Sequence, residues 1–198
     1  MERVRTTPVP DPAGGVHYGG TVIYRTARLT VRPWTAADSD VERIFDTYSR
    51  WEVARWLGAT PRAMRTRSEA KAAVTRFAAR SEPDPTFGIW AIEVHGTGAV
   101  AGSVLLVPLP GGTGEIEVGW HLHPDSWGNG YATEAATGAL ARAFAAGVPE
   151  VYAVVRPGND PSTAVCRRLG MTPLGRTTRW YGVECEAFRI EHQQNSGT

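Results

Sequence analysis

Apolar and polar residues alternate near the middle of the chain. Val118, Trp120 and Leu122 occupy every second position, which is the period of a β-strand. Pro124 ends this pattern, because proline cannot donate a hydrogen bond to a neighbouring strand. Over residues 132–146 the apolar positions recur at helical spacing instead. The pattern therefore predicts a strand, a short loop and then a helix.

The same two periods divide the rest of the chain into strands and helices. Further strands are predicted at residues 28–34, 87–94, 99–107, 151–155, 174–181 and 184–190. Further helices are predicted at residues 35–50, 51–57, 66–80 and 160–169. Thr66 and Glu69 have the spacing of a capping box, which places the start of a helix there. The predicted order is β-α-α-β-β-β-α-β-α-β-β, in which strands and helices are mixed along one chain, so an α/β fold is expected.

Length and composition indicate one globular domain. A chain of 198 residues with 42% hydrophobic residues can bury a core of ordinary size. Residues 1–20 are rich in proline and glycine and are predicted to form a flexible tail, and residues 192–198 are predicted to form a polar one. The domain is therefore expected to span residues 21–191.

Charge and cysteine content narrow the class of protein. A formal net charge of +1 gives no large field that would attract nucleic acid or a membrane surface. No apolar run approaches the ~20 residues of a membrane-spanning helix. Cys166 and Cys185 lie far apart and form no disulfide framework. We expect a protein of the reducing cytoplasm with no nucleic-acid or membrane partner.

The loop before the central helix carries the clearest chemical signal. Gly128 and Gly130 permit positive φ and close backbone approach at the start of a helix. The first amides of a helix are unpaired and lie at its positive end, an arrangement that binds phosphate. The loop lacks the third glycine of a dinucleotide fingerprint and the Gly-Lys-Ser/Thr ending of a nucleoside-triphosphate loop. A phosphorylated ligand is predicted on residues 127–132.

Trp127-Gly-Asn-Gly-Tyr-Ala132 resembles the acyl-CoA pyrophosphate loop of the GNAT N-acetyltransferases, Gln/Arg-x-x-Gly-x-Gly/Ala. Trp127 replaces the usual Gln or Arg, as in many members of the ribosomal-protein N-terminal acetyltransferase (Rim-type) branch, which the run over residues 123–135 resembles most. Asn159-x-x-Ser162, followed by Leu-Gly-Met at 169–171, is similar to the family's Asn-x-x-Ser/Ala…Leu-Gly-Phe motif beside the pantetheine arm. The order of predicted elements is also that of the family.

The resemblance implies a GNAT fold: a mixed, mostly antiparallel, twisted sheet of about six to seven strands flanked by about four helices. It implies acetyl-CoA as cosubstrate and direct acetyl transfer to a primary amine, either a protein N-terminus or a small-molecule amine. The alternatives are an antibiotic or polyamine acetyltransferase and a catalytically inactive acyl-CoA-binding module. A monomer or homodimer is expected. The implied cofactor-binding residues are His121, Leu122, His123, Trp127, Gly128, Asn129, Gly130, Tyr131, Ala132, Thr133, Asn159 and Ser162.

Acetyl transfer to an amine requires a group that accepts the amine proton. Glu117 is the first candidate, because it lies on the motif strand near where the family places a carboxylate; the alternative is a glutamate that serves only strand pairing. His121 and His123 are further candidates, since imidazole titrates near neutral pH. The two histidines have metal-binding spacing, but no third ligand is close in sequence, so no metal site is predicted.

The other two tasks are stabilising the developing oxyanion and protonating the thiolate. The family bends the motif strand at a bulge, so backbone amides near residues 121–123 are the expected oxyanion donors. The tyrosine that many relatives use as general acid is Cys166 here. Ser162 is the nearest hydroxyl, although it can equally cap the helix or contact pantetheine. Cys166 is expected to be packed in the core rather than to act as a nucleophile.

Two groups of residues are candidates for the acceptor side. The aromatic residues in the segments that wall the acceptor site in this family are Trp51, Trp56, Trp180 and Tyr181. A basic run lies in and just before the helix predicted at residues 66–80, and it is a solvated face or a surface that attracts an acidic acceptor. Its members are Arg62, Arg65, Arg67, Arg76 and Arg80.

Overall fold

The computed structural model describes residues 21–192, so the predicted N-terminal tail and all but the first residue of the C-terminal tail lie outside the described residues. The strands are β1 (Tyr24–Arg25), β2 (Leu29–Pro33), β3 (Gly88–Val94), β4 (Val100–Pro108), β5 (Ile116–Leu122), β6 (Glu150–Val155), β7 (Thr172–Thr177) and β8 (Cys185–Glu191). The helices are α1 (Asp38–Ser49), α2 (Trp51–Ala54), α3 (Arg67–Ala79), α4 (Tyr131–Ala145), α5 (Asp160–Arg168) and the short 3₁₀ helix η1 (Pro124–Ser126).

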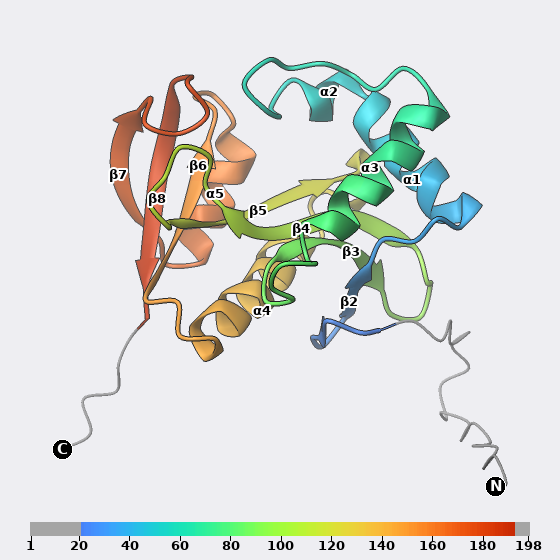
Figure 1. Cartoon of the computed structure of the whole chain (residues 1–198), viewed down its shortest axis with the longest axis horizontal. Coiled ribbons are helices and arrows are strands. Elements are labelled where there is room, and N and C mark those ends of the chain that lie inside the picture. Colours follow the sequence, from blue (N-terminus) through green and yellow to red (C-terminus); the bar gives the residue numbers. More distant parts are fainter. Residues whose placement is uncertain (1–20, 193–198) are drawn as a thin grey trace, which may run out of the picture.

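The strands form one mixed sheet in the order β1-β2-β3-β4-β5-β6-β8-β7. Neighbouring strands are antiparallel except for β5 and β6, which are parallel. The parallel contact is short: Ile116 pairs with Val151 and Glu117 with Tyr152, and beyond these pairs the two strands separate. Figure 1 shows β5 and β6 diverging toward opposite halves of the molecule. This divergence creates the candidate site.

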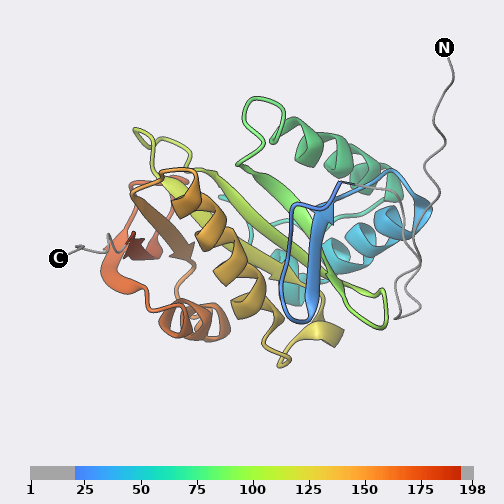
Figure 2. The same ribbon diagram turned by 90° about the horizontal axis from the view of Figure 1, so that it is seen from below.

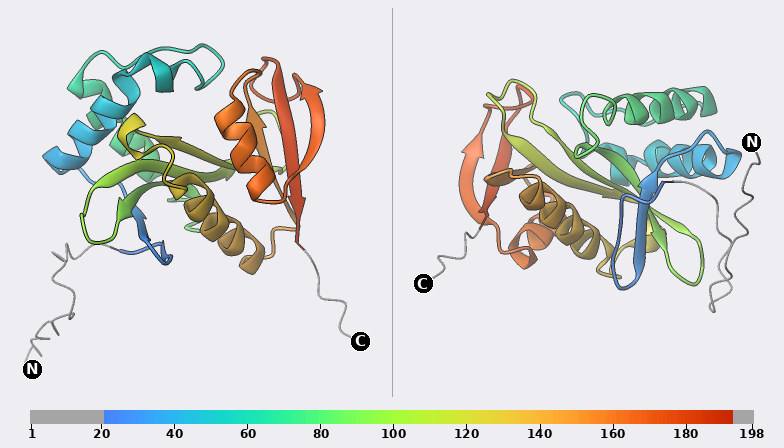
Figure 3. Two further views of the ribbon diagram at one scale, coloured as in Figure 1. Left: turned by 180° about the vertical axis from the view of Figure 1, so that it is seen from behind. Right: turned by 60° about the horizontal axis from the view of Figure 1, so that its bottom comes forward.

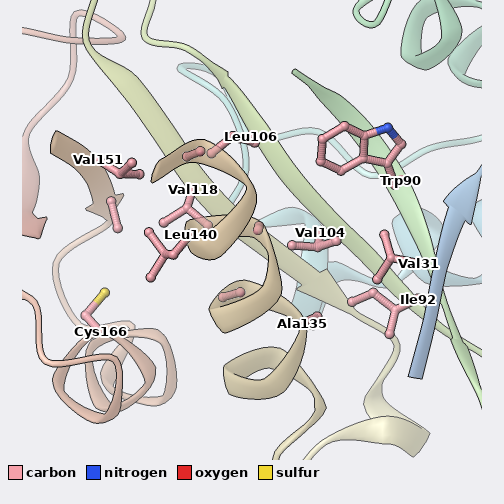
Figure 4. Close-up of a cluster of buried hydrophobic side chains, with 14 of the residues drawn as sticks. Val31, Trp90, Ile92, Val104, Leu106, Val118, Ala135, Leu140, Val151 and Cys166 are labelled. Carbon is pink, nitrogen blue, oxygen red and sulfur yellow. The ribbon is translucent and has the colours of Figure 1, made fainter. Parts of the chain in front are cut away.

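Helices cover both faces of the sheet. Figure 2 shows α4 lying across one face, with α1 and α3 on the other. The main core lies beneath α4, where alternate residues of β2 to β6 meet a run of alanines on the helix; Figure 4 shows Val104, Val118 and Ala135 in this layer. A smaller core on the opposite face joins α1 and α3 to β3 through Ile44, Ala73 and Ala91. Figure 3 shows α5 beside β6 and β8 on the far flank.

The predicted α/β sheet is confirmed, with corrections at its ends. The described residues hold eight strands and five α-helices rather than about six to seven and about four. The two-residue strand β1 is too short to produce a periodic pattern. The Thr66 side chain caps α3 by accepting from the Glu69 amide, as predicted. The helix predicted at residues 35–50 begins later, at Asp38: its N-cap is Ala37, and the Thr35 side chain donates to Asp40.

The last hairpin also differs from the prediction. The strand expected at 174–181 is β7, which ends at Thr177, and the residues before β8 form a turn. Tyr181 in this turn has a φ of 61°, a conformation that is strained for a bulky side chain, and Gly182 follows with a φ of 64°. The turn projects Tyr181 toward β5 rather than extending the sheet. Within residues 21–192, no helix is both long enough and apolar enough to cross a membrane.

Candidate active site

A cleft of about 760 Å³ opens where β5 and β6 separate. One wall is the second half of β5 with the loop that follows it, and the other is the end of β6 with the start of α5. The segment of α2 and the turn carrying Tyr181 close the side away from α4. The cleft therefore connects the glycine loop to Glu117, which lies at the point where the two strands begin to part.

The divergence does not arise from a bulge in β5, contrary to the expectation from the family. β5 pairs with β4 in continuous register from Ile116 to Leu122, and a register shift lies instead between β3 and β4 at Ile92. The amide of His123 donates to the Ala101 carbonyl. By the alternation of an antiparallel ladder, the amides of Trp120 and Leu122 then point toward the open β6 side.

The glycine loop presents free backbone donors at the start of α4. Gly128 and Gly130 have φ values of 76° and 79°, which favour glycine. A Cβ at Gly128 would meet nothing within 4 Å, so the space in front of the loop is open. The first backbone hydrogen bond of α4 runs from the Glu134 amide to the Gly130 carbonyl, and the amides of residues 131–133 precede it. Phosphate fits this geometry.

An ion pair fixes the loop to the edge of the sheet. Arg28 Nε lies 2.6 Å from Glu134 Oε2, and Arg28 Nη1 donates to the Asn129 carbonyl at 3.1 Å. Glu134 also accepts from Thr26 Oγ1 at 2.6 Å. The same guanidinium lies over the Tyr131 ring, 5.2 Å from its centre. Arg28 is half exposed, so its charge faces the solvent beside the loop. None of these contacts was predicted, because the partners are more than a hundred residues apart.

Most of the predicted cofactor residues line the cleft. Those that do are His121, Leu122, Trp127, Gly128, Gly130, Tyr131, Ala132, Thr133, Asn159 and Ser162. Trp127 donates through Nε1 to the Leu122 carbonyl at 2.9 Å, so it braces the loop against the end of β5. Asn129 contributes backbone to the loop while its side chain donates to the Trp127 carbonyl. Asn159 caps α5 by accepting from the Ser162 amide at 3.5 Å.

Glu117 is a buried carboxyl group inside the cleft. Its side chain shares a face of β5 with Gly119 and His121, and the residue is 7% exposed. Burial raises the pKa of Glu117 from 4.5 to about 7, although a hydrogen bond from Tyr181 opposes this rise. The Tyr181 hydroxyl donates to Glu117 Oε2 at 2.5 Å. A carboxyl with a pKa near the working pH is suited to accept and release a proton.

His121 is held neutral on the same face of β5, four residues beyond Glu117. Its Nδ1 lies 3.2 Å from the Tyr48 hydroxyl, which is 2.9 Å from Ser103 Oγ, and the two aromatic rings meet edge to face. Burial lowers the pKa of His121 to about 4. A histidine with so low a pKa is a weak base at neutral pH. Tyr48 belongs to no motif in the sequence. It reaches the site only because the end of α1 packs against β5, which no local pattern indicates.

His123 does not line the cleft. It lies beyond the end of β5, where α1 and η1 cover it, and only 6% of the residue is exposed. Its Nδ1 accepts from the Asp125 amide, and its Nε2 lies 2.9 Å from Asp46 Oδ2. These contacts fix the turn after β5. We therefore leave His123 out of the proposed set of catalytic and cofactor-binding residues.

The two cysteines occupy different environments. Cys166 is fully buried in the main core, where burial raises the pKa of its thiol to about 12, and it lies outside the cleft. Figure 4 shows its sulfur directed into the core from α5. Cys185 on β8 lines the cleft, and its pKa is raised by burial. Both are free thiols. The family motif drew attention to Cys166, whereas Cys185 has no motif that marks it.

The four aromatic residues considered for the acceptor side separate into two pairs. Trp56 and Tyr181 line the cleft. Trp180 is buried in a small cluster with Tyr152, and Trp51 is 56% exposed outside the cleft. Trp51 and Trp180 are therefore removed from the candidate acceptor wall. Within the described part of the chain, no group of three or more His, Cys, Asp or Glu side chains is placed to hold a metal ion.

Comparison with known proteins assigns the family. A family model described as an acetyltransferase (GNAT) domain matches residues 28–172, which is well over half of the chain. The chain belongs to the GNAT acetyltransferase family. The match includes β5, the glycine loop, α4 and the Asn159 segment, so the family assignment covers the residues that carried the resemblance.

Relatives agree with this assignment. The N-acetyltransferase YoaA of Bacillus subtilis, itself of uncharacterised function, is 30% identical over 155 residues, covering 77% of this chain and 84% of YoaA. The structure of this chain is also similar to that of an acetyltransferase from Agrobacterium tumefaciens. The two are 25% identical with a TM-score of 0.70, and the match covers 90% of this chain and 98% of the other. RimL, a ribosomal L7/L12 α-N-protein acetyltransferase solved with coenzyme A, matches at 16% identity and a TM-score of 0.69, covering 86% and 98% of the two chains.

Proposed function

We propose that this chain is an N-acetyltransferase that moves an acetyl group from acetyl-CoA directly to a primary amine. The observation that carries the proposal is the position of Glu117: a buried carboxyl with a pKa of about 7, in the cleft that leads from the open amides of α4. Membership of the GNAT family supports acyl transfer as the class of reaction. Acetyl-CoA is the cosubstrate that the predicted loop fits best.

The residues of the cleft suit acetyl-CoA. The loop at 128–133 would hold the pyrophosphate with its free amides. Asn159 and Ser162 line the wall where the family places the pantetheine arm. When bound, acetyl-CoA supplies an acetyl group activated as a thioester. The remaining chemistry depends on side chains and amides of this chain.

Glu117 accepts the proton of the acceptor amine in this proposal. Its raised pKa matches its basicity to neutral pH, and Tyr181 holds the carboxylate in one orientation. The amides of Trp120 and Leu122 face the opening and are the donors proposed for the developing oxyanion. Ser162 is the proposed source of a proton for the thiolate. His121 is proposed to shape the site as a neutral group bonded to Tyr48.

The nature of the acceptor distinguishes the alternatives. A Rim-type activity on a protein N-terminus and an activity on a small amine use the same chemistry in different clefts. A cationic antibiotic or polyamine requires acidic residues around the acceptor side, and the arginines around α2 and α3 argue against it. An inactive acyl-CoA-binding module would have no need of a buried carboxyl with a raised pKa. From its two free cysteines we expect the protein to act in the cytoplasm.

The test is acetyl transfer in the presence of a broad panel of amines, measured as release of the coenzyme A thiol. Glu117→Gln should bind acetyl-CoA normally and lower turnover by ~10²-fold or more, the usual contribution of a positioned general base. Glu42→Gln, an exposed glutamate on α1, is the control and should be unaffected. Binding of acetyl-CoA without thiol release on any amine would point to a binding module instead.

A further inference from the structure

A second cavity of about 330 Å³ adjoins the cleft on the side away from α4. It lies between α2, α3 and the sheet, and it shares Leu57 and His121 with the cleft. Its walls are mostly apolar, with Met64, Phe77 and Ile89 among them. Glu117 and His121 are four residues apart on β5, roughly 13 Å along the strand, so a molecule whose amine lies at Glu117 enters this space when it is long enough to span that distance. The volume is at the lower end of the range for small-ligand sites.

The rim of this second cavity carries positive charge. Arg62 and Arg76 line it, together with a single acidic residue, Glu69. Glu69 is already paired with Arg62, at 3.0 Å. Arg67 on the same helix is paired with Asp38 and Glu42 outside the cavity. Within residues 21–192, no acidic side chain pairs with Arg76, so its charge is free to meet a ligand.

A further arginine lies near the mouth of the cleft. Arg55 lines the cleft, where its guanidinium lies over the Trp56 ring at 4.5 Å. Glu52 also lines the cleft, where Arg50 is its ion-pair partner. Arg55, Arg62 and Arg76 still outnumber the two carboxylates of the acceptor side, Glu52 and Glu69. An amine that approaches Glu117 is favoured when it also carries negative charge.

A bridge across the cleft favours a small acceptor over a polypeptide. Arg156, which follows β6, donates through Nη2 to the carbonyls of Gly58 and Ala59, at 2.5 and 2.8 Å. The loop after α2 is thereby tied to the opposite wall. An extended chain would need an open groove at this position, whereas a small molecule needs only the space between the walls.

We infer that the acceptor is a small amine with an apolar body and an anionic group, the body occupying the second cavity and the anion paired with Arg76. This inference rests on the proposed acetyltransferase function and specifies its substrate class. Arginine suits a carboxylate or phosphate because its guanidinium offers paired donors. The neutral ring of His121 lines the passage between the two spaces without adding charge.

The experiment compares matched pairs of amines in acetyl-CoA-dependent thiol release. One pair is 8-aminooctanoate and 8-aminooctanamide, whose two ends are far enough apart to reach both sites, and the other is 4-(aminomethyl)benzoate and benzylamine. The member of at least one pair that carries the carboxylate should have a kcat/KM about 10-fold or more above the member that lacks it, as expected for one charge-assisted hydrogen bond. Arg76→Ala should remove this difference by raising KM for the carboxylate-bearing member alone. Arg67→Ala, the matched control, should preserve it.

The other outcomes separate this inference from the proposed function. Equal rates within both pairs, a loss in Arg76→Ala that affects both members equally, or a preference for a free-N-terminal peptide or a polyamine would overturn the inference while leaving amine acetylation intact. The absence of transfer to any amine would overturn the proposed function and the inference with it. Charge reversal in Arg76→Glu gives a second check, because it should invert the preference within the responsive pair.

Discussion

The Tyr181 hydroxyl donates a hydrogen bond to Glu117 Oε2 across the cleft, from a residue 64 positions away in the chain. Tyr181 has a φ of 61°, and it is the one non-glycine residue with positive φ in the described part of the chain. Strained backbone of this kind persists where the surrounding structure requires it, and it concentrates at functional sites. This hydrogen bond joins the turn before β8 to the proposed base. A change in the position of Tyr181, which lines the cleft, would therefore change the pKa of Glu117.

Tyr181→Phe should move the acid limb of the kcat/KM profile to higher pH. The hydrogen bond favours the carboxylate, so its removal raises the pKa of Glu117 above its present value of about 7. We expect a displacement of about one pH unit, the effect of losing one hydrogen bond to a charged group. The measurement is kcat/KM against pH from 5 to 9, with an acceptor identified as described above.

Tyr152→Phe provides the control for this displacement. Its hydroxyl donates to Glu150 at 2.6 Å, away from the cleft, so its loss should leave the profile in place. Tyr181→Phe keeps the ring and the backbone conformation, and a change in turnover without a change in the profile would assign Tyr181 a structural role only.

The sequence indicates which side chains share a face of β5, but it does not indicate which groups pack against them. Glu117 and His121 lie four positions apart on one strand, and a period of two places their side chains on the same face. Tyr48 and Tyr181 reach these residues from a helix end and a turn, and no local pattern encodes where those segments pack. His121 and His123 have the i, i+2 spacing of residues that share a face of a strand. His123 nevertheless lies beyond the end of β5, where α1 covers it through Asp46.

The glycine loop was predictable for a different reason. Its proposed role in binding pyrophosphate depends on backbone amides and positive φ, and both follow from glycine at fixed positions before a helix. The clamp between Arg28 and Glu134 was not predictable, because it depends on how the first long strand packs beside α4. The family resemblance implied that a bulge in β5 separates it from β6, whereas β5 is regular and the two strands simply pair over two residues before they part. The sequence of β5 alone does not show how far its neighbours pair with it.

Gly130→Asp should weaken acetyl-CoA binding by 10-fold or more, because a carboxylate at the start of α4 repels the pyrophosphate and competes for its amides. Gly130→Asn is the matched control: asparagine also tolerates the φ of 79° and has a similar shape without the charge. Isothermal titration calorimetry with acetyl-CoA measures both variants. Wild-type affinity in Gly130→Asp would move the phosphate site away from this loop.

Ser162→Ala should lower the single-turnover rate only modestly, on the order of 10-fold, which is below the usual range for a general acid. A thiol with a pKa of about 8.5 is already a fair leaving group, so its protonation matters less than removal of the amine proton. Thr163→Ala, a neighbouring hydroxyl buried on the other side of α5, is the comparison. A loss of 10³-fold or more for Ser162→Ala alone would make the serine essential to the chemistry.

Cys166→Ala should retain acetyl transfer while losing some stability, roughly 1–3 kcal/mol, because it leaves a small cavity in the core. Its buried thiol, with a pKa of about 12, holds no thiolate at neutral pH that could be acetylated. Mass spectrometry of the enzyme incubated with acetyl-CoA and no acceptor tests this. A stable acetyl adduct on Cys166 would replace direct transfer with a two-step route, and an adduct on Cys185 would assign that step to the cleft cysteine.

Glu117→Gln should stabilise the fold at pH 8 and change it much less at pH 5, a result that needs no acceptor. The pKa of Glu117 is raised in the folded state from 4.5 to about 7, so the folded chain keeps a proton that the unfolded chain loses between these values. The stability associated with this group is therefore present below about pH 4.5 and is lost as the pH rises through about 7. Glutamine stays neutral throughout, so the difference in unfolding free energy between variant and wild type should grow by roughly 3 kcal/mol across this window.

Urea unfolding at pH 5 and pH 8 measures this difference, with Glu42→Gln as the control for an exposed glutamate. A difference that does not change with pH would mean that Glu117 titrates like an ordinary carboxyl, and the proposed base would then lose its physical basis. A gain in stability at pH 8 together with a loss of turnover would instead show that the fold keeps a destabilising carboxylate in the cleft for its chemistry.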